Sequence, residues 1–153
     1  VRAPQALVFD LARSVDVHQA STSQTQEEAI AGKTEGLMEL GDEVTWRARH
    51  FGVRQTLTSR ITAFERPNHF RDSMVSGAFR QFDHDHFFHL QDDGTVLMED
   101  VFAYSAPLGP LGWLAERIFL TAYMRRFLRV RNEMVAAIAE SDDWKQFLSA
   151  DQY

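Results

Sequence analysis

Apolar and polar residues alternate with a period of two from Ala29 to Tyr104, and after Pro110 the apolar period becomes helical to about Glu140. Such alternation is typical of strands with one buried and one exposed face, and the later period is typical of an amphipathic helix. A helix of about 30 residues would be about 45 Å long, so it needs an apolar surface to lie against. The sequence therefore predicts an α+β domain in which a curved antiparallel sheet wraps around a long C-terminal helix over residues 110–139.

The first predicted hairpin turns at Gly52-Val53, because Gly in the first position of a two-residue turn suits type II′. Phe51 then pairs with Arg54, and one face of the hairpin is mostly apolar while the other carries Thr and Arg. A slip of one residue would turn every side chain to the opposite face, so the pattern specifies the buried face. The expected inward residues are Val44, Trp46, Ala48, His50, Gln55, Leu57, Ser59 and Ile61.

The second predicted hairpin turns at Asp92-Asp93-Gly94, a three-residue loop with Gly in the left-handed position. Gln91 then pairs with Thr95. The expected inward pairs are Leu90 with Val96, Phe88 with Met98, His86 with Asp100, His84 with Phe102, and Phe82 with Tyr104. Between the hairpins we expect a turn at residues 66–68 and a strand over residues 70–76, with Phe70, Asp72 and Met74 inward.

The two ends of the chain are also expected to pack on this domain. Pro4 suits the first turn of a short helix that runs to Ala12, and the polar stretch 19–26 is expected to be a loop or a frayed helix. The tail 141–153 carries Trp144 and is expected to pack back as a short helix. The sequence contains no repeat or linker that would divide it, so residues 1–153 are expected to form one domain.

Composition excludes several classes of function. The formal net charge of −6 argues against nucleic acid, which is bound mainly through a basic face. No cysteine is present, so disulfides, thiolate metal ligands and a cysteine nucleophile are excluded. The sequence has no apolar run of the ~20 residues that span a bilayer and no signal peptide before Val1, so a cytoplasmic location without a membrane span is expected.

Four segments, taken in order, resemble the SRPBCC (START/birch-pollen-allergen) superfamily, in its branch similar to polyketide cyclases and dehydrases. They are Arg2-Ala-Pro-Gln-Ala-Leu-Val-Phe-Asp-Leu-Ala12, Ile61-Thr-Ala-Phe-Glu-Arg-Pro67, the strand start Gly94-Thr95, and Ser105-Ala-Pro-Leu-Gly-Pro-Leu-Gly112. The superfamily opens with a strand before the first helix, and Val1-Arg2 is at most its tail. That strand is either cut away or outside the numbering.

The resemblance implies the helix-grip fold, with a cavity between sheet and C-terminal helix that holds lipids, sterols, polyketides or other apolar guests. The partner that we expect is therefore a small apolar ligand. The residues expected to contact it are Trp46, His50, Leu57, Ile61, Phe82, His84, His86, Phe88, Met98, Asp100, Phe102, Tyr104, Leu114 and Ile118.

Polar residues on the predicted inner face allow three interpretations. His84, His86 and Asp100 resemble a two-His, one-carboxylate metal site. A His held by a carboxylate can also move protons, so these three residues are the catalytic candidates if the chain is a cyclase or dehydratase. We prefer the third interpretation, in which they are polar anchors in a binding cavity and no metal or cofactor is required. An interaction module with a filled core is a further alternative.

Overall fold

A computed structural model of the chain describes residues 1–22, 26–50, 52–77, 79–105, 120–149 and 153. The helices are α1 (Gln5–Ala12), α2 (Val15–Ser21), α4 (Thr121–Ala139) and the 3-10 turn η2 (Asp143–Gln146). The strands are β1 (Glu28–Gly32), β2 (Glu43–His50), β3 (Val53–Glu65), β4 (His69–Ser76), β5 (Gln81–Leu90) and β6 (Val96–Ser105). Among the described residues, no helix is both long and apolar enough to cross a bilayer.

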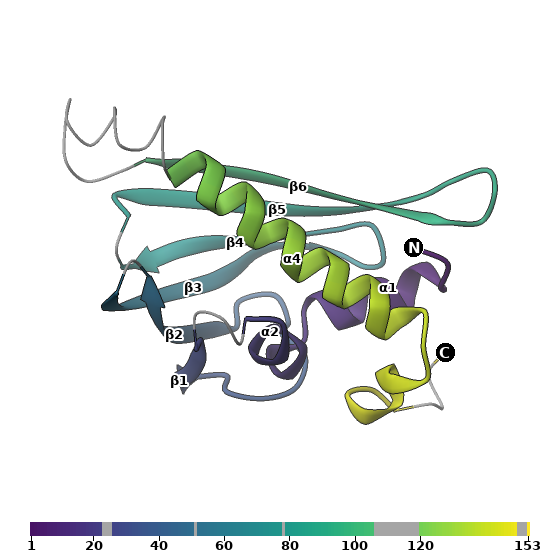
Figure 1. The fold of residues 1–153 in the computed structure, drawn as a ribbon, viewed down its shortest axis with the longest axis horizontal. Coiled ribbons are helices and arrows are strands. Elements are labelled where there is room, and N and C mark those ends of the chain that lie inside the picture. The colour runs from purple at the N-terminus through teal and green to yellow at the C-terminus, as the bar shows by residue number, and fades with distance from the viewer. Residues whose placement is uncertain (23–25, 51, 78, 106–119, 150–152) are drawn as a thin grey trace.

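The six strands form one antiparallel sheet in the order of the sequence, and α4 crosses one face of it (Figure 1). We call this covered side the inner face. Helix α1 contacts the C-terminal half of α4, and the buried core lies where these two helices meet the sheet. Phe9 of α1 is fully buried there, with its ring 5.2–5.4 Å from those of Phe64, Phe70 and Phe88. The predicted α+β architecture is confirmed.

The register of the second hairpin is confirmed at every predicted pair from Phe82–Tyr104 to Leu90–Val96. Gly94 has a φ of 80°, as the predicted three-residue turn requires. In β4, Phe70 pairs with His86 and Asp72 with His84, so the predicted inward face of this strand is also confirmed.

The register of the first hairpin differs from the prediction by two residues. His50 pairs with Val53, so Gly52 takes the second turn position, not the first, with a φ of 79°. Trp46 therefore pairs with Leu57, whereas the prediction aligned it with Ser59. Because the shift is an even number of residues, no side chain changes face. The predicted inward face is confirmed.

The helical segments match the sequence with two qualifications. Helix α1 ends at Ala12 and α4 at Ala139, as predicted. The predicted start of the long helix lies in residues 106–119, outside the described residues. Helix α2 was not predicted as an element, but it ends at Ser21, inside the stretch 19–26 that was expected to be a loop or a frayed helix. Ser14 caps it by accepting a hydrogen bond from the backbone N–H of Val17 at 3.3 Å.

The two ends of the chain are held to the domain. Val1 donates a hydrogen bond to the carbonyl of Val96 and accepts one from its N–H, both at 2.8 Å. In the tail, Trp144 and Phe147 pack against the core, so the predicted packing of residues 141–153 is confirmed for its described part.

Asp10 is a buried carboxylate that joins three distant parts of the chain. Its side chain is 1% exposed and accepts hydrogen bonds from Arg13 Nε and Arg66 Nη2, both at 2.7 Å, and from the Tyr153 hydroxyl. Burial opposes ionisation, but the hydrogen bonds from Arg66, Tyr153 and Arg13 outweigh it and lower the pKa of Asp10. Burial and the Asp10 charge raise the pKa of Tyr153 to about 12.

We predict that Asp10→Asn lowers the free energy of unfolding by about 1.5–3 kcal/mol at pH 7, because it removes the charge that accepts hydrogen bonds from Arg13 and Arg66, of which Arg13 keeps Glu39 as a second acidic partner. The lowered pKa means that the carboxylate stabilises the fold above its unfolded pKa of about 3.8 and that this contribution disappears as pH falls through the folded pKa. The difference between parent and variant should therefore shrink below about pH 4 in urea titrations. The exposed Glu65→Gln is the charge-matched control, and equal stability of Asp10→Asn and parent at pH 7 would contradict the prediction.

Candidate functional site

Four polar side chains from three adjacent strands meet on the inner face of the sheet. Asp72 lies on β4, His84 and His86 lie on β5, and Asp100 lies on β6. The register sets Asp72 opposite His84 and His86 opposite Asp100. Because residues i and i+2 of a strand share a face, both imidazoles point to the same side, and we call the four residues the His–Asp cluster.

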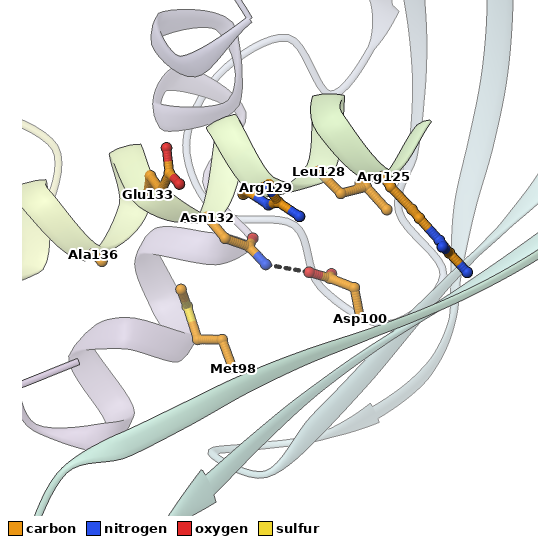
Figure 2. Close-up of a pocket in the computed structure, with 8 residues that line it drawn as sticks. All are labelled: Met98, Asp100, Arg125, Leu128, Arg129, Asn132, Glu133 and Ala136. Atoms are coloured by element: carbon orange, nitrogen blue, oxygen red, sulfur yellow. Dashed lines mark hydrogen bonds between the residues drawn. The ribbon is translucent and has the colours of Figure 1, made fainter. Parts of the chain in front are cut away.

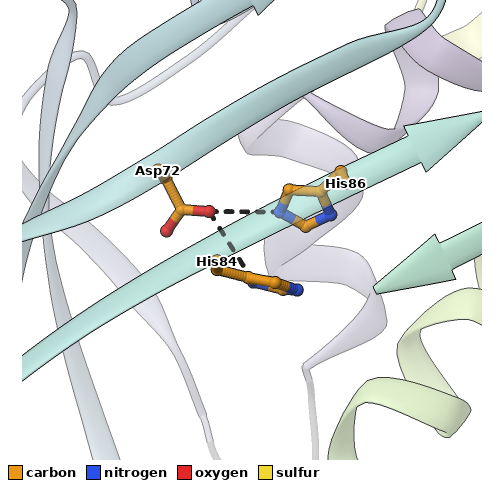
Figure 3. A group of neighbouring side chains, drawn as sticks. All are labelled: Asp72, His84 and His86. Atoms are coloured by element: carbon orange, nitrogen blue, oxygen red, sulfur yellow. Dashed lines mark hydrogen bonds and ion pairs between the residues drawn. The ribbon is translucent and has the colours of Figure 1, made fainter. Parts of the chain in front are cut away.

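Each imidazole of the cluster contacts both carboxylates, and Figure 3 shows the contacts with Asp72. His84 Nε2 and His86 Nδ1 are 2.8 and 2.9 Å from Asp100 Oδ1. On the other side, His86 Nε2 and His84 Nδ1 are 3.1 and 3.6 Å from Asp72 Oδ1. The two rings are tilted by 43° with their centroids 3.8 Å apart. Asp72 and Asp100 thus share both imidazoles.

The surroundings of the cluster are mostly aromatic and dry. Phe70 stacks on His86 at 4.2 Å, and Phe102 meets His84 edge-on at 5.1 Å. The two imidazoles are 6–8% exposed and Asp72, the most open member, is 20% exposed. These positions follow from the alternating sequence, which places Phe and His on one face of β5.

Burial and mutual charge set the protonation of the cluster. Burial, followed by the charge of His86, lowers the pKa of His84, which favours its neutral form near pH 7. Burial opposes ionisation of Asp100, but the hydrogen bonds and charges of the two imidazoles outweigh it and lower its pKa. A neutral imidazole beside a carboxylate can accept or relay a proton.

Helix α4 is joined to the cluster through Asn132, which donates a hydrogen bond from Nδ2 to Asp100 Oδ2 (Figure 2). The preceding residue, Arg131, is buried and donates to the carbonyl of Ala12 at 2.6 Å, which ties α4 to α1. Consecutive residues of α4 therefore contact the sheet and the first helix. Both contacts fix how the helix lies over the inner face.

Beside this contact, β6 and α4 enclose an open groove of about 480 Å³. Its surface is mostly apolar. The groove is lined by Met98 and Asp100 from β6 and by Arg125, Leu128, Arg129, Asn132, Glu133 and Ala136 from α4 (Figure 2). Asp100 is shared by the groove and the His–Asp cluster, so a molecule in the groove would lie one carboxylate away from the imidazoles.

The predicted site residues fall into separate groups. His84, His86 and Asp100 come together as predicted, and Met98 and Asp100 line the groove. Trp46, Ile61 and Phe88 belong to the buried core around α1. Phe82, Phe102 and Tyr104 form an aromatic row with ring centroids 5.2–5.3 Å apart, and the Tyr104 hydroxyl is 2.8 Å from Thr121 Oγ1. Leu57 is half-buried on β3.

The side chain of His50, together with Leu114 and Ile118, lies outside the described residues. The assignment of the whole predicted set to ligand binding stays a prediction. Sequence reasoning placed Asp72 inward but did not include it in the site, and it missed Asn132 and its neighbours on α4. The helical spacing of Leu128, Asn132 and Ala136, four residues apart, was the signal that could have found the groove side of α4.

Comparison with known proteins supports the fold. No protein-family model matches the sequence, and no curated protein sequence matches it. Among solved structures, TTHA0849 from Thermus thermophilus is similar over 92% of this chain and 94% of its own, with a TM-score of 0.69 and 18% identity. Major latex-like protein 151 from Panax ginseng is similar over 92% and 93%, with a TM-score of 0.67 and 14% identity.

A third structure, the di-domain ARO/CYC StfQ from the steffimycin biosynthetic pathway, matches over 95% of this chain and 44% of its own, with a TM-score of 0.60 and 15% identity. Together with the six-stranded sheet and the C-terminal helix, these similarities show that the chain has the helix-grip fold. The fold class implied by the sequence resemblance is confirmed.

We predict that Asn132→Ala lowers the free energy of unfolding by about 1.5–3 kcal/mol, the range for a hydrogen bond to a charged group. Its loss should also raise amide hydrogen exchange in α4 more than in β5, because the contact joins helix to sheet. Glu133→Ala, which changes the neighbouring exposed residue on the same groove, is the control. If Asn132→Ala is less stable than the parent but amide hydrogen exchange in α4 is unchanged, the contact does not hold the helix on the sheet.

Proposed function

We propose that this chain binds a small, largely apolar molecule in the groove between β6 and α4. The observation that carries the proposal is the groove itself, whose mostly apolar surface and volume of about 480 Å³ fall in the range of about 300–1,000 Å³ typical of small-molecule sites. The helix-grip fold supports the same conclusion, because the resemblance of the sequence to the SRPBCC superfamily implies a cavity for apolar guests between the sheet and the C-terminal helix.

The polar groups of the groove favour a guest with one polar end. Asp100 and Asn132 lie at its base and can orient a hydroxyl or carbonyl group. Arg125 and Arg129 also line the groove, and neither guanidinium makes an ion pair within the described residues. Two guanidiniums beside an apolar surface favour a guest with an anionic or enolic oxygen. An amphipathic molecule therefore suits the groove better than a pure hydrocarbon.

We predict that Ala136→Trp weakens binding of 8-anilino-1-naphthalenesulfonate, an apolar ring system with one anionic group, by at least about tenfold. The indole would occupy the groove into which Ala136 faces. The matched control is Ala137→Trp, which places the same side chain at the next, exposed position of α4. Fluorescence titration gives both affinities, and urea unfolding checks that both variants are folded.

Equal affinities in the two Trp variants would exclude the groove as the binding site. If the parent does not bind this probe, and native mass spectrometry detects no co-purified small molecule, the carrier hypothesis is wrong. The chain is then better explained as an interaction module that binds no small molecule.

A second candidate is a polyketide cyclase or dehydratase, favoured by the neutral His84 beside two carboxylates and one residue away from the groove. Asp100, which lines the groove, can accept a proton from the carbon between two carbonyl groups of a bound guest, and the neutral His84 beside it can relay that proton to a hydroxyl that leaves as water.

We predict that Asp100→Asn separates the two candidates. For a carrier, Asp100→Asn should weaken binding of a guest whose hydroxyl donates to this carboxylate, such as 1-naphthol, by about 1–3 kcal/mol and nothing more. For an enzyme, conversion of a poly-β-ketone thioester, followed by mass spectrometry, should be present in the parent and abolished in Asp100→Asn and His84→Gln. Glu99→Gln, at an exposed position on the opposite face of β6, is the control expected to keep both properties.

A further inference from the structure

We infer that Asp72, His84 and His86 form a binding site for one divalent transition-metal ion, with Asp100 as the carboxylate that supports both imidazoles. The inference does not depend on the proposed ligand groove. It follows from the protons available to the His–Asp cluster, from the spacing of its atoms and from the groups around it.

If both imidazoles are neutral, the cluster has more nitrogen–oxygen contacts than N–H donors to fill them. Its four nitrogen–oxygen contacts, at 2.8, 2.9, 3.1 and 3.6 Å, join two imidazoles to two carboxylates. A neutral imidazole carries a single N–H, so two neutral rings can donate in only two of these contacts. In the others a nitrogen lone pair faces an anionic oxygen in a largely buried place. A cation between these atoms would turn that repulsion into attraction.

Three of the atoms have the spacing of metal ligands. Asp72 Oδ1 is 3.1 Å from His86 Nε2 and 3.6 Å from His84 Nδ1, and one ligand atom of each residue lies within 4.8 Å of the others (Figure 3). Zinc bonds of about 2.0–2.1 Å at tetrahedral angles place ligand atoms roughly 3.3–3.4 Å apart. The observed separations lie on either side of that value, so small side-chain shifts would complete the coordination.

The far nitrogens of both rings are held as they are in metal sites. His84 Nε2 and His86 Nδ1 both contact Asp100 Oδ1, at 2.8 and 2.9 Å. A carboxylate behind a ligating imidazole fixes the proton on the far nitrogen and leaves the near nitrogen free to bind metal. Asn132 holds the other oxygen of Asp100, so this support reaches α4. The cluster therefore contains three residues that can bind the ion and a fourth, Asp100, that orients the two imidazoles among them.

The donor set selects the kind of ion. Two imidazoles and one carboxylate suit Zn²⁺ or Fe²⁺, whereas Mg²⁺ and Ca²⁺ prefer oxygen ligands throughout. Three protein ligands leave at least one coordination position for water or for an oxygen of a guest. A proton is the alternative to a metal ion in the cluster. It would convert one imidazole to imidazolium and supply the N–H donor that two neutral imidazoles lack.

The test is metal binding by the parent after removal of metals with a chelator. Titration with Zn²⁺ followed by calorimetry, and with Co²⁺ followed by its visible spectrum, should give one ion per chain with a Kd below about 1 µM. Asp72→Asn and His84→Gln should abolish binding, and Asp100→Asn should weaken it about 10- to 100-fold. His69→Gln is the matched control, because His69 contacts the carboxylate of Asp85 at 2.6 Å without belonging to the cluster.

Two results would overturn the inference. One is a folded parent that takes up no stoichiometric metal. The other is binding that survives in a folded Asp72→Asn, since this nearly isosteric change keeps the shape of the site. Circular dichroism and unfolding curves establish that each variant is folded. If the parent takes up no metal, nitrogen chemical shifts that show an imidazolium in the cluster at pH 7, unchanged by added Zn²⁺, would identify a proton as the occupant of the cluster. Binding of the apolar probe is measured separately, so failure of either proposal leaves the other testable.

Discussion

Helix α4 lies on a sheet face that is not uniformly apolar, and Asp100 is the point where helix, sheet and groove meet. One of its oxygens contacts both imidazoles of β5, and the other accepts a hydrogen bond from Asn132 of α4. A largely buried carboxylate is costly unless its oxygens are occupied, and here both are. The polar contact therefore specifies one position of α4 on a surface where apolar packing alone would allow several.

Buried polar contacts also fix the relative positions of secondary-structure elements at two other points of the domain. Arg131 is buried and donates to the carbonyl of Ala12, the last residue of α1, so it satisfies an acceptor that the end of a helix leaves free. Asp10, on α1 itself, gathers Arg13, Arg66 and Tyr153. Both contacts lie at the end of the domain where Phe9 fills the core, and they tie the first helix to α4, to a turn of the sheet and to the C-terminal tail.

The sequence predicts a feature of this structure well when the residues that determine it are close together in the chain, and poorly when they are far apart. The second hairpin follows from strict alternation and from Gly94, whose position in the turn admits one register. In the first hairpin Gly52 suits either turn position, so the register could shift by two residues while the buried face could not change. The contact of Asp72 with His86 depends on where β4 lies beside β5, which no short pattern encodes. The contact of Asn132 with Asp100 spans 32 residues and needs the helix already in place.

The position of Asp100 also makes the groove and the His–Asp cluster parts of one site. A polar group bound in the groove would compete with Asn132 for one oxygen of this carboxylate, while the imidazoles hold the other oxygen. Positive charge on or between His84 and His86 draws electron density toward Oδ1 and makes Oδ2 a weaker acceptor for Asn132 and for a guest. A positive charge in the cluster would therefore also affect how firmly α4 is held and how a polar group placed in the groove is oriented, because a single carboxylate carries both interactions.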